Sequence, residues 1–202
     1  MPPTVRPSRD QLEREIVDRA AALFARHGFA HTSLQAVADA AGYSKAGLLH
    51  HFPSKEALHE AALALSRGQA QHVLDLVAEL PAGPERDLRA IEALTDAALT
   101  TPGLTALNLS LVPELGAGPP SGRPQPDGEL LLQIFGVDLT SSDPDRLVRV
   151  VSALAGLSVV ALVAHQVADP AGWRESIVAA SFDALGHRRP SASPSVPDQV
   201  EA

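Results

Sequence analysis

The chain has 202 residues, a formal net charge of −8 and no cysteine, which excludes disulfides, thiolate metal sites and thiol nucleophiles. Hydrophobic residues make up 45% and charged residues 20%, as in an ordinary folded protein, and only seven aromatic residues are present, too few for a platform that stacks single-stranded nucleic acid. The N-terminus lacks the apolar run of a signal peptide, and the longest apolar stretch, 150–164, is shorter than the ~20 residues of a membrane span, so we expect a cytoplasmic protein with no membrane association.

The first elements in the chain are a disordered arm and two helices. Residues 1–9 are proline-rich and are expected to be disordered. Apolar residues at helical spacing predict a helix over 10–27. Thr32 and Gln35 match a capping box, which predicts that a second helix begins there and ends at Gly42.

Two further helices follow after short breaks. Ser44 is placed to cap a third helix over 45–51, which Pro53 ends, and Ser54 is placed to cap a fourth over 55–80. The second and third helices, joined by a tight turn, predict a helix-turn-helix. Its expected core consists of apolar side chains from all the helices: Phe24, Leu34, Val37, Leu48 and Phe52.

The remainder of the chain also has helical patterns. The predicted helices are 85–100, 104–115, 129–137, 144–167 and 171–185, with a turn at 102–103 and a Gly/Pro-rich loop over 116–128. No stretch alternates with the period of a strand. The sequence therefore predicts an all-α fold of about nine helices, with a DNA-binding head (1–58), a helical body (59–186) and a disordered tail (187–202).

Charge is distributed unevenly between these parts. Residues 1–67 hold eight basic and seven acidic side chains, whereas residues 68–202 hold eight arginines and seventeen acidic side chains. Both lysines of the chain lie in the first part. A near-neutral head on an acidic body is compatible with DNA binding by the head alone.

The segment G-Y-S-K-A-G-L-L-H-H-F-P-S-K-E-A-L, residues 42–58, resembles the DNA-binding signature of the TetR family of regulators. The preceding run, L-F-A-R-H-G-F-A-H-T-S-L-Q-A-V-A-D-A-A-G, resembles it too. The resemblance extends from Ile16 to about Leu58 with fixed spacings. Beyond that, the chain agrees with the family only in helical content and length.

The resemblance implies two kinds of DNA contact. Base edges would be read by the residues that open the third helix, Lys45, Ala46 and Gly47. Phosphates would be bound by polar side chains around them: Thr32, Ser33, Ser44, His50, His51 and Lys55. Where this chain has Leu49, the family often has a tyrosine that commonly supports a contact to the DNA backbone. Leucine cannot donate a hydrogen bond, so either His50 or His51 takes that role or binding is weaker.

Two sets of candidate residues lie in the body. The last two helices carry apolar and small residues suited to a dimer seam, and the resemblance favours a four-helix interface there: Val151, Leu154, Leu157, Ala161, Ile177 and Phe182. Candidate effector-binding residues are Leu104, Leu107, Asn108, Leu111 and Phe135. Asn108 stands out because a polar group on an apolar helix face needs a partner, which backbone, water or an effector could supply.

The function implied by the resemblance is that of a homodimeric transcriptional regulator. It would bind a pseudo-palindromic operator in double-stranded DNA as a repressor, and a small apolar effector would release it. No cofactor or metal is expected, and no plausible nucleophile with a base is present in the sequence, so we do not expect an enzyme. The alternatives are an all-α enzyme and, more plausibly, a helical protein-binding adaptor without catalysis.

Overall fold

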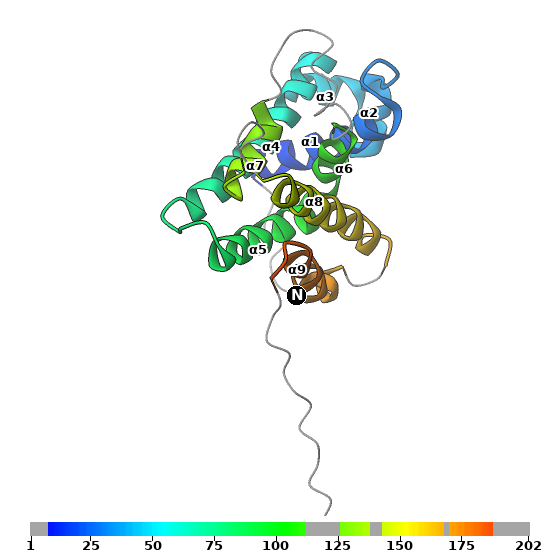
Figure 1. Ribbon diagram of the computed structural model, residues 1–202. Helices are drawn as coiled ribbons and strands as arrows, with labels where there is room; N and C mark the ends of the chain where they lie inside the picture. Colours follow the sequence, from blue (N-terminus) through cyan, green and yellow to red (C-terminus); the bar gives the residue numbers. More distant parts are fainter. Residues whose placement is uncertain (1–7, 112–125, 138–142, 168–169, 188–202) are drawn as a thin grey trace, which may run out of the picture.

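The structure, a computed structural model, describes residues 8–111, 126–137, 143–167 and 170–187 (Figure 1). Within these ranges the chain is all-α, as predicted, with a single short 3-10 helix at Ala171–Trp173 and no strand. The α-helices are α1 (Arg9–His27), α2 (Leu34–Ala41), α3 (Lys45–His51), α4 (Lys55–Val77), α5 (Pro84–Thr100), α6 (Pro102–Leu111), α7 (Pro126–Ile134), α8 (Pro144–Ala164) and α9 (Arg174–Ala184).

The helices predicted over 55–80, 129–137 and 144–167 end three residues earlier, and the α-helix predicted over 171–185 begins three residues later. Three other predicted boundaries are wrong for local reasons. Pro102 and Pro126, predicted to lie in a turn and a loop, each begin a helix, because the first helical position needs no N–H donor and suits the fixed φ of proline. Ser8, predicted to lie in the disordered arm, caps α1 in a reciprocal capping box with Gln11. Residues 1–7 of the predicted arm, 112–125 of the predicted loop and 188–202 of the predicted tail lie outside the described residues.

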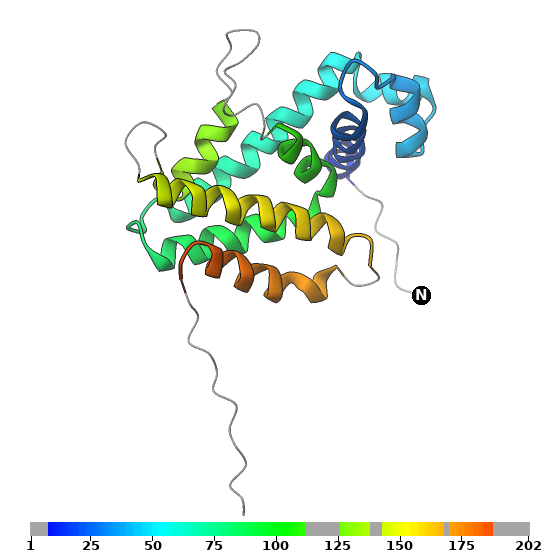
Figure 2. The ribbon, with the colours of Figure 1, turned by 45° about the vertical axis from the view of Figure 1, so that its right-hand side comes forward.

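Two apolar clusters organise the helices. One includes the inner faces of α1 to α4 together with Leu104 and Leu107 of α6. The other gathers α5, α7, α8 and α9 around the C-terminal half of α4. In Figures 1 and 2, α2 and α3 lie at the opposite end of the molecule from α9, and α4 runs between the two regions. α6 follows α5 in the chain, yet it packs in the core of the N-terminal helices.

A close approach between α6 and α1 fixes this arrangement. The N–H of Leu104 donates to the Asp18 carboxylate at 2.9 Å. Gly103 lies so near the backbone of Asp18 that a Cβ there would overlap the Asp18 carbonyl oxygen and come within 2.7 Å of its carbon. Burial raises the pKa of Asp18, although hydrogen bonds from the first-turn N–H groups of α6 oppose this shift. The carboxylate thus caps the first turn of α6 from a neighbouring helix.

A buried carboxylate also joins three segments of the body. Asp87 of α5 is 1% exposed, and Arg146 of α8 donates from one guanidinium nitrogen to its carboxylate at 2.8 Å. The Nε2 atom of His187, after α9, lies 2.7 Å from the same carboxylate. Since an uncompensated charge at this depth would be costly, these two partners keep α5, α8 and the end of α9 together.

α8 is unusually apolar. With 21 residues, α8 is long and apolar enough to cross a membrane by length and composition. The expectation that the longest apolar segment is too short for a membrane span, which rested on residues 150–164 alone, is therefore corrected. This is weak evidence, because core helices of folded proteins pass the same test. Here one face of α8 packs on α5, α6 and α9.

The contact between Gly103 and Asp18 predicts an asymmetry between two glycines. Gly103→Ala should lower the free energy of unfolding by about 3 kcal/mol or more, because backbone atoms cannot move aside as a flexible side chain would. Gly68→Ala, inside α4 with nothing within 4 Å of the added Cβ, should raise it by about 0.5–1 kcal/mol. Denaturant unfolding of both variants measures the difference, and equal stabilities would contradict the close approach.

Candidate nucleic-acid interface

α2 and α3 form a helix-turn-helix whose ends are set by local capping. Ser33 accepts a hydrogen bond from the Ala36 N–H at 3.1 Å, and Ser44 accepts one from the Gly47 N–H at 3.0 Å. Gly42 ends α2 in the left-handed conformation with a φ of 75°, where a side chain would be strained. The sequence signals for this turn and for the bounds of α3 are therefore confirmed.

α3 is anchored by one face. Leu48 is fully buried against the same core as Phe24 and Val37. Because successive residues of a helix point about 100° apart, the opposite side is formed by Ala46 and His50, which are exposed. We define the open face of α3 as its four exposed residues, Lys45, Ala46, Leu49 and His50.

The other flank of α3 is covered from within the chain. A Cβ added at Gly47 would lie 3.6 Å from Cδ1 of Tyr43, so this glycine is half-buried by the turn. The His51 ring contacts Tyr43 edge-on with centroids 5.8 Å apart, and its Nδ1 lies 3.2 Å from a carboxylate oxygen of Glu13 on α1. Hydrogen bonds from Arg9 and then His51 lower the pKa of Glu13. Gly47 and His51, predicted to contact DNA, thus pack toward Tyr43 and α1.

Lys55 has a structural role that the sequence does not reveal. Its Nζ donates to the carbonyl oxygens of Phe29 at 2.8 Å and Ala30 at 3.4 Å, and it lies 4.3 Å from the centroid of the Phe29 ring. The ammonium group thereby ties the start of α4 to the loop after α1. One of its three N–H groups is left for the predicted phosphate contact.

The predicted capping box at Thr32 is wrong. Thr32 is 4% exposed, and its hydroxyl donates to the carbonyl of Gly28 at 2.9 Å, so it closes the loop between α1 and α2 from inside. Ser33 takes the capping position, one residue later, and Gln35 bonds to Asp39. The predicted phosphate contact at the start of α2 therefore falls to Ser33, whose side chain is on the surface.

The five candidate effector residues do not come together. Leu104 and Leu107 are buried in the core of the N-terminal helices, whereas Phe135 is buried in the core of the body. Asn108 accepts a hydrogen bond from the Ser66 hydroxyl of α4 at 2.8 Å, which supplies the partner that its position demands. Leu111, the last residue of α6, is half-buried. The set therefore marks the α4–α6 junction and a separate body core, not one pocket.

The candidate dimer residues are also divided. Leu157, Ala161, Ile177 and Phe182 are buried within this chain, and Leu154 is partly buried against the body core. Most of their surface is covered because α8 and α9 pack on each other and on α5, although Leu157 and Ile177 also line the groove between α8 and α9. Val151 is exposed. Further exposed valines of α8 were not singled out from the sequence: Val148, Val159 and Val163 lie away from the body, and Val160 lies beside α9.

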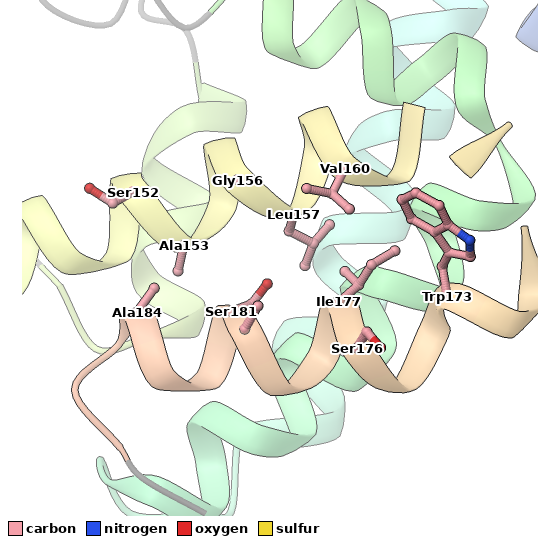
Figure 3. Close-up of a pocket in the computed structure, with 11 residues that line it drawn as sticks. Ser152, Ala153, Gly156, Leu157, Val160, Trp173, Ser176, Ile177, Ser181 and Ala184 are labelled. Carbon is pink, nitrogen blue, oxygen red and sulfur yellow. The ribbon is translucent and has the colours of Figure 1, made fainter. Parts of the chain in front are cut away.

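A shallow apolar groove runs between α8 and α9 (Figure 3). It has a volume of about 320 Å³. Trp173 lies at one end of it, and Ser152 with Ala184 lies at the other. Gly156 and Ala180 line it without large side chains. Among the described residues, no group of three or more histidine or acidic side chains is placed to hold a metal ion.

The comparisons concern mainly the N-terminal helices. Residues 16–62 match the model of bacterial regulatory proteins of the tetR family. Over 51 residues the chain is 45% identical to the HTH-type transcriptional regulator RutR of Escherichia coli (strain K12), which covers 25% of this chain and 24% of that protein. Over 49 residues it is 45% identical to the HTH-type transcriptional repressor KstR2 of Rhodococcus jostii (strain RHA1), 24% of each. The matches thus span about a quarter of these relatives.

Solved structures share the fold over most of the chain. A TetR-like transcriptional regulator from Rhodococcus sp. RHA1 superposes with a TM-score of 0.55 and 19% identity, covering 91% of this chain and 100% of that one. The TetR-family regulator PfmR from Thermus thermophilus superposes with a TM-score of 0.51 and 23% identity, covering 84% of this chain and 96% of that one. At these identities the likeness extends the shared all-α fold to the body but carries no function there.

The contacts of the two lysines predict different effects on stability. Lys55→Ala should lower the free energy of unfolding by about 1–2 kcal/mol, because it removes two charge-assisted hydrogen bonds and the contact with Phe29. Lys45→Ala, an exposed helix position, should stay within about 0.5 kcal/mol of the parent protein. Denaturant unfolding of the two variants side by side decides this. If both were as stable as the parent, the structural role of Lys55 would be refuted.

Proposed function

We propose that this chain is a dimeric, sequence-specific transcriptional regulator of the TetR family in the cytoplasm, because residues 16–62 match the model of bacterial regulatory proteins of the tetR family. The observation that carries the proposal is the open face of α3. This face lies on a short helix that the buried Leu48 anchors in the core and that Ser44 caps. Its small and basic side chains are exposed to solvent.

The open face suits the major groove of DNA. The groove is ~12 Å wide and accepts one α-helix. Ala46, near the centre of this face, lets the helix backbone come close to the base edges, while Lys45 and His50 supply donors beside it. Ser33 at the exposed start of α2 and the remaining N–H of Lys55 are placed for phosphates on either side.

A second copy of the chain is the proposed partner of α8 and α9. The exposed valines of α8 give it a bare apolar side although its other side is buried in the body. Monomeric proteins rarely expose a continuous apolar surface of this kind. The groove beside it, with the half-exposed Trp173 at its end, extends the same surface onto α9. Pairing across this surface would place two α3 helices on two half-sites of a pseudo-palindrome.

We further propose that a small apolar effector releases this regulator from its operator, as a repressor. α4 contributes to both cores, and α6, which also contacts α5 and α8, is tied to α1 by Asp18. A molecule that binds the body better when α4 or α6 is displaced would therefore change the spacing of the heads. It can do so only to the extent of its differential affinity for the two arrangements.

Selection from random DNA tests the proposal. The full chain at near-physiological salt is mixed with a pool of random double-stranded DNA, and the bound fragments are sequenced. We expect one palindromic motif to be enriched, and we expect Lys45→Ala to weaken binding to it about tenfold to a hundredfold. Absence of any motif, with the protein folded and free of effector, would refute the regulator and leave the protein-binding adaptor.

Charge on the exposed side of α8 should separate the two copies. The double variant Val159→Asp/Val163→Asp places carboxylates where an apolar seam is proposed, so sedimentation velocity should give a monomer, with operator binding at least about tenfold weaker. Leu76→Asp is the matched control, because Leu76 of α4 is 55% exposed and lies outside this surface. A double variant that sediments as the parent does would place the dimer seam elsewhere.

A further inference from the structure

Leu49 is an exposed leucine on the helix that carries the open face. Its side chain is 38% exposed, whereas its neighbour Leu48 is fully buried and already supplies the anchor of α3. The exposed part of this side chain contributes nothing to folding, since its apolar surface stays hydrated. The packing of the domain therefore gives no reason for this part of the leucine to be apolar.

The place of Leu49 on α3 is set by helix geometry. Lys45 and Leu49 are four residues apart and so lie about one turn apart on the same flank. The opposite flank, with Gly47 and His51, is covered by Tyr43 and α1. The uncovered surface thus has Ala46 and His50 along its middle and the pair Lys45 and Leu49 along its free edge.

This edge carries one hydrogen-bond donor, the ammonium group of Lys45, and one apolar side chain, that of Leu49. In the major groove, the base edges offer hydrogen-bonding atoms and a single apolar group, the C5-methyl of thymine. A leucine placed against an amino or carbonyl group would remove it from water without giving it a partner, which is costly. Against the thymine methyl, both partners lose apolar surface to water, which is favourable.

We propose that Leu49 is a specificity-determining residue that reads the C5-methyl group of one thymine in each half-site of the operator. The inference rests on the proposed function, because it needs α3 in the major groove. Four residues of helix rise by about 6 Å, and base pairs are about 3.4 Å apart. The thymine is therefore expected within about two base pairs of the base that Lys45 contacts.

Removal of single methyl groups from the DNA tests this assignment. Duplexes carrying the selected motif are made with each thymine in turn replaced by deoxyuridine, symmetrically in both half-sites, which deletes only the methyl. Affinity is measured by fluorescence anisotropy with the full chain. Loss of one methyl contact should weaken binding roughly threefold to fourfold. Because a dimer contacts two half-sites, we expect one symmetric position at which deoxyuridine weakens binding about tenfold. At that position Leu49→Ala should bind thymine and deoxyuridine duplexes equally.

Two controls keep the result specific to Leu49. Leu49→Ala should unfold as the parent does, because the side chain is exposed and alanine favours helix. Lys45→Ala should weaken binding to every duplex while retaining the penalty for deoxyuridine at the same position. If the parent protein has no methyl-sensitive thymine, or if Leu49→Ala keeps the full penalty, the assignment is overturned. A selection that enriches no motif overturns the proposed function as well, so the two failures are distinguishable.

Discussion

The first turn of α6 lies directly on the backbone of α1, and this contact holds α6 in the core of the N-terminal helices. It requires a residue without a side chain at 103 and an acceptor for the N–H of Leu104, which Asp18 provides at 2.9 Å. Leu104 and Leu107 can then complete the core of the N-terminal helices. The N-terminal end is consequently built from two segments far apart in the chain, and α6 belongs to its packing.

The position of α3 depends on that core. With Leu48 buried and one flank covered by Tyr43 and α1, the helix has a single orientation in which its side chains can be free. The same packing uses residues that a signature alone would assign to DNA. His51 faces Glu13, and Lys55 holds the loop after α1. A residue type that recurs at a position in DNA-binding domains can therefore also serve the domain's own architecture.

The body differs from the N-terminal helices in its charge and in its exposed apolar surface. Its only deeply buried acidic side chain among the described residues, Asp87, is used to join helices, while the exposed side of α8 is left apolar. An acidic, partly apolar body would repel phosphates and favour association with another protein surface. The proposed division of the chain into a DNA-contacting end and an association end rests on where each kind of side chain is left exposed.

Local sequence signals were sufficient to place many of the helix ends and the helix-turn-helix, because caps such as Ser44 and the turn glycine Gly42 act on backbone groups within four residues. The signature over 42–58 also indicated the tetR family, whose model matches residues 16–62. Only the tertiary structure decided which face of α8 is bare and that α6 packs with the N-terminal helices. These outcomes depend on contacts between residues far apart in the chain, as between Asp18 and Leu104, and α8 is apolar around most of its circumference, so periodicity could not orient it.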